Sequence, residues 1–199
     1  MAEVRVAYPA RGSASGLVLL FGAIIAVSAL YWPTVASIGK RWITDPTYSH
    51  GFLVGAISLW LCWRTWRSGA LEGARGSWVG LAATLAAGLA WLLAAAASIQ
   101  VIQQLAVPAI LLGAIWAIFG WRGFWALLIP LGVLYWVLPA WDYLRPPLQG
   151  LTVEAVGVAL DFLSIPAFIH GYYVELPNGR FEIVAGCSGL HFFMAAGAL

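Results

Sequence analysis

The C-terminal stretch Tyr172–Leu199 decides how the rest of this chain is interpreted; it reads YYVELPNGRFEIVAGCSGLHFFMAAGAL. Asn178-Gly179 separates two runs of alternating residues, which is the strongest short-range signal for a β-hairpin. A two-residue turn there places four apolar side chains on one face: Val174, Leu176, Phe181 and Ile183. An apolar run follows Gly186–Gly189, so the hairpin is predicted to lead directly into a hydrophobic helix with Cys187 at the joint.

The register of this hairpin has two solutions. The first places Glu175 opposite Glu182, which is unfavourable unless a cation such as Arg180 intervenes. The second, with Pro177 opening a type I turn and Gly179 as a bulge, separates the glutamates but spoils the apolar face. We expect the first register.

Cys187 is the residue at which chemistry is expected. It or Ser188 would occupy the N-cap or first turn of the following helix, where the positive helix end favours a thiolate. The alternative is a small packing residue, because free cysteines are often buried and inert. Cys62 lies within the apolar run SLWLCWRTW, which favours packing. Two cysteines and three scattered histidines give no metal-ligand spacing and no default disulfide.

Composition indicates an integral membrane protein. Of 199 residues, 62% are hydrophobic and only 9% are charged, whereas roughly a quarter of the residues are charged in a soluble domain. The formal charge of +2 is too small to indicate a nucleic-acid partner. The sequence predicts an all-α polytopic membrane protein with five to six transmembrane helices, an outer-face helix and the β-hairpin.

A single membrane domain is expected over residues 1–199. Residues 1–14 form a cytoplasmic N-terminus, residues 34–50 form the first loop, and Gly120–Gly123 forms a tight turn. Within residues 15–139 five spanning helices are predicted: Gly16–Trp32, Gly51–Trp66, Ser77–Ala97, Ile99–Phe119 and Phe124–Leu138. The small residues of the third helix allow close packing.

The positive-inside rule orients these helices. Arginines gather in the loop after the second helix and in the turn after the fourth, which makes both cytoplasmic: Arg64, Arg67, Arg75 and Arg122. Residues 34–50 and 140–186 then lie on the outer face, together with His50 and Cys187. Tryptophans near the end of the second helix, at Trp60, Trp63 and Trp66, mark an aromatic belt.

The region 140–186 carries the weakest topological signal. Pro146–Leu163 has a helical pattern, but Glu154 and Asp161 argue against a plain lipid-facing span. We expect it to lie on the outer surface or to be partly re-entrant; if it spans, Cys187 moves to the cytoplasmic side. Residues 187–199 begin a further transmembrane helix that stops after about half the length needed, so a fragment of a longer protein is expected.

Two stretches resemble the exosortase and archaeosortase family. Asp45–Gly51, DPTYSHG, is similar to the YSHG signature near the second helix of that family. The segment from Leu176 through Leu190 resembles its hairpin followed by the CSG active-site motif. The spacing between the two motifs and the run of five helices also match, so the resemblance covers essentially the whole chain.

The resemblance implies a membrane cysteine peptidase, and specifically a transpeptidase. Its partners would be exported proteins with a C-terminal sorting signal, which consists of a short motif (Pro-Glu-Pro in bacteria), a hydrophobic helix and a basic tail. It implies multi-pass residence in the bacterial inner membrane among its lipids, a site facing the periplasm, and association with exopolysaccharide loci. No cofactor is expected, and the sequence does not indicate an oligomeric state.

The same resemblance makes Cys187 the nucleophile and His50 the candidate base within this chain. Tyr48 and Ser49 would shape substrate access. Arg180 would either meet a substrate carboxylate or, as we favour, neutralise Glu175 and Glu182.

The chain departs from the family in two respects. The family's catalytic Arg and its basic partner lie after the Cys-bearing helix, beyond Leu199. Many members also have Arg where this chain has His191, so any role of that Arg is in doubt here. His191 would assist the thiol or, more simply, pack at an interface.

Two other functions fit the residues. One is a non-catalytic protein that binds or transports a lipid or polysaccharide precursor, with Cys187 structural. The other is an inactive truncated exosortase.

Overall fold

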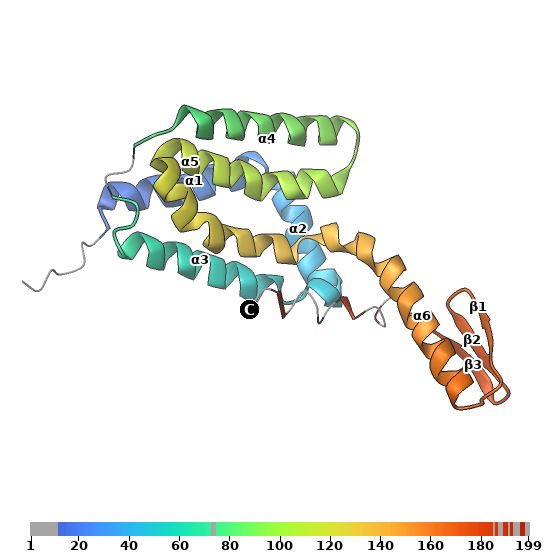
Figure 1. Cartoon of the computed structure of the whole chain (residues 1–199). Coiled ribbons are helices and arrows are strands. Elements are labelled where there is room, and N and C mark those ends of the chain that lie inside the picture. The colour runs from blue at the N-terminus through green and yellow to red at the C-terminus, as the bar shows by residue number, and fades with distance from the viewer. Residues whose placement is uncertain are drawn as a thin grey trace, which may run out of the picture.

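The computed structural model describes residues 12–72, 75–184, 186, 189, 190, 192, 196 and 197. Over these residues the fold is mostly helical, with a small sheet near the C-terminus (Figure 1). The α-helices are α1 Ala14–Leu30, α2 Trp32–Thr44, α3 Gly51–Arg67, α4 Trp78–Ala96, α5 Gln100–Gly132 and α6 Arg145–Phe162. Short 3-10 helices are η1 Pro46–Tyr48, η2 Val133–Val137 and η3 Pro139–Leu144, and the strands are β1 Phe168–His170, β2 Tyr173–Leu176 and β3 Gly179–Glu182.

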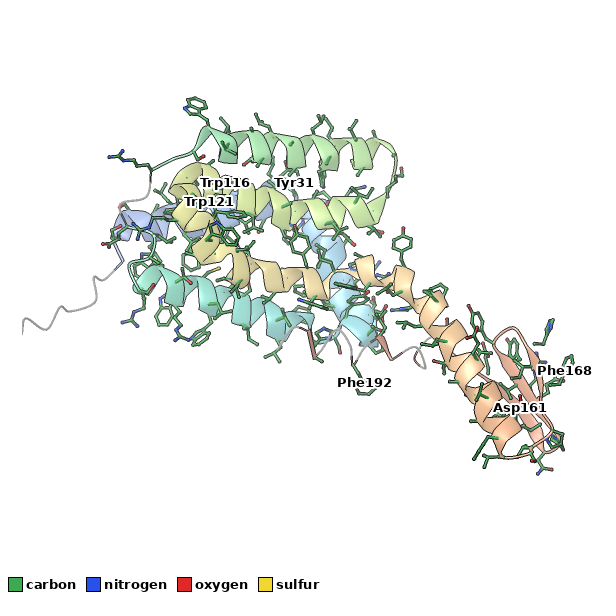
Figure 2. The ribbon with its side chains drawn as sticks, viewed as in Figure 1. Tyr31, Trp116, Trp121, Asp161, Phe168 and Phe192 are labelled. Atoms are coloured by element: carbon green, nitrogen blue, oxygen red, sulfur yellow. The ribbon has the colours of Figure 1, made fainter. Side chains whose placement is uncertain are left out.

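Helix α5 forms the centre of the bundle and holds most of the buried side chains of the main hydrophobic cluster. At Gly120 its backbone has φ +65° and ψ −164°, so it consists of two legs, and the chain reverses there in Figure 1. Trp116 and Trp121 lie at this reversal (Figure 2), with ring centroids 5.3 Å apart. The predicted break between two helices at Gly120–Gly123 is therefore confirmed.

Helix α4 packs closely along the first leg of α5. Gly80 lies against the backbone of Trp116 and Ala117, and Gly113 lies against the backbone of Thr84. Neither site has room for a Cβ atom, which confirms that small residues allow these helices to approach closely.

The part of the chain that the structure describes has two helices long and apolar enough to cross a membrane. These are Trp78–Ala96 and the segment Gln100–Val137, which includes both legs of α5 and η2. A third span results if α1 and α2, which meet at an angle of 89°, count as one broken span. The prediction of a polytopic helical membrane protein is supported in this coarser form.

The prediction that residues 34–50 form a loop is wrong. Residues 32–44 are the helix α2, with Pro33 in its first turn, where the missing N–H breaks no helical hydrogen bond. Thr34 and Ile38, four residues apart, are both buried, so one face of α2 packs inward. Only residues 45–50 remain as a connection, and η1 lies within it.

Helix α6 confirms the helical pattern after Pro146 and extends away from the bundle (Figure 1). It has no buried residue, and the sheet lies alongside it. Gln149 donates a hydrogen bond from Nε2 to the Ile183 carbonyl at 3.0 Å, and Ile169 of β1 approaches Gly157. Figure 2 shows Asp161 and Phe168 in this distal part of the molecule.

The hairpin register that we expected is wrong. The sheet has the antiparallel order β1-β2-β3, and Glu175 pairs with Arg180 while Tyr173 pairs with Glu182. Pro177 and Asn178 form the turn, as in the second register. The pairing shift of two residues keeps Val174 opposite an apolar residue, Phe181, so the apolar face survives. It also exchanges a glutamate pair for an ion pair.

Candidate active site

The motif DPTYSHG forms a tight turn between α2 and α3. The Asp45 carboxylate accepts a hydrogen bond from the Thr47 backbone N–H at 3.0 Å, and Pro46 opens the 3-10 helix η1. The Ser49 hydroxyl donates to the Pro46 carbonyl at 2.9 Å and is exposed. This local order turns the side chain of Tyr48 inward, where it is fully buried.

Tyr48 is the centre of a small hydrophobic cluster that joins distant parts of the chain. Its ring packs against Leu190, which is also buried, and Trp42, Trp141 and Leu148 surround the pair. Its hydroxyl donates a hydrogen bond to Asp142 Oδ1 at 2.8 Å. The ring therefore contacts apolar residues while its polar tip meets a carboxylate, as buried tyrosines require.

Four charged residues form what we call the Asp–Arg cluster: Arg41, Asp45, Asp142 and Arg145. Asp142 lies 2.6 Å from Arg41 and 3.0 Å from Arg145. Asp45 lies 3.3 Å from Arg145 and 3.5 Å from Arg41. The formal charges cancel, and the cluster ties α2 and the motif turn to η3 and the start of α6.

The pKa values of two side chains of this site, Asp45 and Tyr48, differ from their ordinary values. Burial by itself would raise the pKa of Asp45, but hydrogen bonds from Thr47 and the nearby Arg145 charge lower its pKa below the ordinary value. Burial and the hydrogen bond to Asp142 raise the pKa of Tyr48. Tyr48 is therefore a neutral hydrogen-bond donor, and Asp45 is an ionised acceptor, at neutral pH.

Sequence reasoning missed the Asp–Arg cluster as a unit. Arg41 and Asp142 are 101 positions apart, and Arg145 and Asp45 are 100 apart, so no local pattern links them. The available signal was the presence of opposite charges in two connections that both follow predicted helices on the outer side.

Of the predicted site residues, Cys187 and His191 lie outside the described residues. Leu190 is described and rests on Tyr48. Leu190 itself is helical, in agreement with the predicted start of a helix. The structure thus brings Tyr48 of the YSHG motif into contact with Leu190.

His50 follows Tyr48 and Ser49 directly and occupies the position before the first residue of α3. Both of its imidazole nitrogens are shielded from solvent. It therefore lies in the same turn as Tyr48, at the end of the bundle to which Leu190 returns.

Arg180 is not brought to this cluster. It lies on β3, 3.7 Å from Glu175 and with its guanidinium 4.1 Å from the centroid of the Tyr173 ring. The sheet stands away from the bundle in Figure 1. The ion pair agrees with the expected neutralisation of Glu175; the expected role toward Glu182 stays a prediction.

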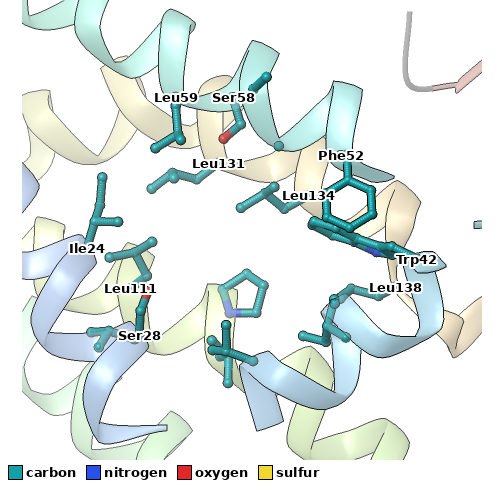
Figure 3. A pocket seen from close by; sticks show the side chains of 18 residues that line it. Ile24, Ser28, Trp42, Phe52, Ser58, Leu59, Leu111, Leu131, Leu134 and Leu138 are labelled. Carbon is teal, nitrogen blue, oxygen red and sulfur yellow. The ribbon is translucent and has the colours of Figure 1, made fainter. Parts of the chain in front are cut away.

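An apolar cavity of about 540 Å³ lies among α1, α2, α3 and α5, below the Tyr48 cluster. Figure 3 shows Ile24, Leu111 and Leu131 on its inner walls, with Trp42 and Phe52 at one end. Of its two serines, Ser58 donates to the Pro130 carbonyl at 2.6 Å. Trp42 belongs both to this cavity and to the cluster around Tyr48.

No group of three or more His, Cys, Asp or Glu side chains that could hold a metal ion occurs within the described ranges. The local chemistry consists of a buried phenol, a balanced set of charges and a solvent-shielded imidazole, next to the segment that carries a cysteine.

Comparison with known proteins identifies one family. A model of the transmembrane exosortase family (Exosortase_EpsH) matches residues 42–199, well over half of the chain. No curated protein and no solved structure matches the chain. The match begins at Trp42, within α2, and includes the Asp–Arg cluster apart from Arg41. The chain therefore belongs to the transmembrane exosortase family.

Proposed function

We propose that this chain carries the nucleophile of a membrane cysteine transpeptidase that cleaves C-terminal sorting signals of exported proteins. One observation carries the proposal. Tyr48, from the YSHG motif, and Leu190, three residues after Cys187, are buried against each other although they are far apart in the sequence. Family membership supports the reaction class, and the contact between Tyr48 and Leu190 supports a common location for His50 and the segment that carries Cys187.

The proposed reaction is acyl transfer. The Cys187 thiolate attacks the scissile carbonyl and forms a thioester, and the amine of the downstream segment leaves with a proton. An acceptor amine, hydroxyl or water then attacks the thioester and regenerates the thiol. The N-terminus of the helix that begins here supplies positive potential for the thiolate and for the oxyanion.

His50 is the proposed base or proton carrier within this chain. Imidazole is the side chain that most often acts as a general acid or base, and His50 is fixed at the start of α3 in the same turn as Tyr48. Ser49, exposed in that turn, and His191 are the proposed polar contacts for substrate.

The test is processing of a co-expressed reporter with a sorting signal in bacterial cells, using the full-length enzyme. Cys187→Ala should abolish the shortened product, because no thioester can form. Cys62→Ala, which replaces the buried cysteine of α3, is the matched control and should process normally. Continued processing by Cys187→Ala would refute the proposal.

A further inference from the structure

Asp142 receives hydrogen bonds or ion pairs from three different elements. Tyr48 of η1 donates to Oδ1 at 2.8 Å, Arg41 of α2 lies 2.6 Å from Oδ2, and Arg145 at the start of α6 lies 3.0 Å from Oδ1. Charge-assisted bonds of this kind are roughly twice as strong as neutral ones. The carboxylate is thus the common acceptor for both arginines and the phenol.

The segment around Asp142 is itself held in place. Trp42 donates from its indole N–H to the Val137 carbonyl at 2.9 Å, and Trp141 donates to the Tyr135 carbonyl at 2.9 Å. Arg145 also reaches Thr47 Oγ1 at 3.3 Å. Residues of η2 and η3 are therefore fixed against α2 and the motif turn, with Asp142 at their meeting point.

We propose that Asp142 is a positioning residue of the site, which fixes the Tyr48 ring as the surface on which the Cys187-bearing segment rests through Leu190. The inference rests on the proposed function. The hydrogen bond to Asp142 fixes the direction of the buried Tyr48 side chain, because a change of its χ1 rotamer would move the hydroxyl and break a bond to a carboxylate. Leu190 therefore packs against a surface of fixed orientation.

Such positioning matters because a nucleophile must be held within about 0.5 Å of its working geometry. The charged groups around the Tyr48 hydroxyl are Arg41, Asp45, Asp142 and Arg145, and His50 lies in the same turn as Tyr48. Asp142→Asn removes one negative charge from a balanced set and leaves Tyr48 with a weaker acceptor. The position of Cys187 relative to His50 and to the helix end should then change.

The experiment measures alkylation of Cys187 by iodoacetamide in the purified full-length enzyme, in a Cys62→Ala background, between pH 6 and 10. In the parent protein the alkylation rate should reach half of its maximum at a midpoint pH below about 8.5, which is the ordinary pKa of a thiol. Tyr48→Phe removes the hydrogen bond to Asp142 without a change of charge, so its midpoint should rise by about one unit, which makes alkylation at pH 7 about tenfold slower. In Asp142→Asn the lost positioning raises the midpoint and the lost negative charge lowers it, so the net shift should be smaller than in Tyr48→Phe, and Asp142→Glu should restore part of the effect.

Two variants serve as controls for this measurement. Asp161→Asn removes an exposed carboxylate of α6, and Tyr143→Phe removes the hydroxyl of a tyrosine that is 71% exposed; neither should move the midpoint. A purely structural role would lower the melting temperature but leave the pH dependence of Cys187 alkylation unchanged. The inference is overturned if both Asp142→Asn and Tyr48→Phe keep the midpoint pH and the limiting alkylation rate of the parent protein. Processing of the reporter in cells that carry the Cys187→Ala variant tests the proposed function separately. A failure of the proposed function can therefore be distinguished from a failure of the role proposed for Asp142.

Discussion

At the scale of single residues, the contact between Tyr48 and Leu190 is the one that joins the two motifs. Both side chains are almost fully excluded from solvent. Truncating a buried leucine removes its packing contacts and leaves a cavity, which costs about 2–5 kcal/mol in protein cores. The loss should therefore affect both stability and the position of Cys187.

Leu190→Ala should lower the melting temperature in detergent, followed by tryptophan fluorescence, and should slow processing of the sorting-signal reporter. Phe192→Ala is the control on the same segment, because Phe192 is 77% exposed and points away from the bundle in Figure 2. Although Phe192→Ala removes more atoms than Leu190→Ala, it should lower the melting temperature and the processing rate less. Equal losses in both variants would contradict a specific role for the Leu190 contact.

Asp45 gives the site a defined response to acid. Its pKa is lowered in the fold, with the Thr47 hydrogen bonds and Arg145 outweighing its burial. Its contribution to stability is therefore present above the unfolded-state pKa of about 4 and is lost as the pH falls through the lower folded-state value. The melting temperature of Asp45→Asn should fall less steeply below about pH 4 than that of the parent. Glu154→Gln, at an exposed carboxylate of α6, should follow the parent.

At the scale of elements, the pairing of α4 with α5 depends on glycine. A Cβ at Gly80 would overlap the backbone of Ala117, and backbone cannot move aside as a flexible side chain can. Gly80→Ala should destabilise the bundle by about 1–3 kcal/mol through overpacking, seen as a lower melting temperature. Gly22→Ala in α1, where no atom lies within 4 Å of the added Cβ, should leave it unchanged or slightly raised. A Gly80→Ala protein as stable as Gly22→Ala would show that the two helices do not pack this closely.

Elements differ in how well the sequence could predict them. Long apolar runs bounded by Gly, Pro and Arg predicted α1, α3, α4 and both legs of α5, because burial in lipid demands continuous helices. Helix α2 was missed because it is short and carries Lys40 and Arg41 on an amphipathic pattern. The hairpin register was missed because Asn-Gly was weighted above the pairing of Glu175 with Arg180. That cross-strand pairing and the turn at Pro177 are local preferences that the Asn-Gly rule alone does not include.

The candidate site was predictable only in part. The YSHG and CSG motifs were visible in the sequence. The contact between Tyr48 of the first motif and Leu190, which follows the second, comes from the structure. The contribution of Asp142 was not visible, because its partners Arg41 and Tyr48 are about a hundred positions away. A charged residue in a connecting segment is usually solvated. Only the fold shows that Asp142 instead accepts bonds from Tyr48, Arg41 and Arg145.

At the scale of the whole molecule, the two ends of the bundle differ in character. One end combines exposed tryptophans with arginines, including Arg64 over Trp60 and Arg67 over Trp63. The other end holds the Asp–Arg cluster. Helix α3, with 17 residues, runs between them over about 25 Å, close to the thickness of the hydrocarbon core of a bilayer. The two ends are therefore expected at opposite membrane surfaces.

Positive residues favour the cytoplasmic side, so the tryptophan and arginine end should face the cytoplasm and the Asp–Arg cluster should face the periplasm. Single cysteines in a background of Cys62→Ala and Cys187→Ala test this orientation. Tyr143→Cys, at an exposed position of η3, should react with a membrane-impermeant maleimide in intact spheroplasts. Ser68→Cys, at the exposed end of α3, should react only after the membrane is permeabilised. The reverse pattern would place Tyr48 and the segment bearing Cys187 on the cytoplasmic side, where an enzyme could not meet the sorting signals of proteins that have already been exported.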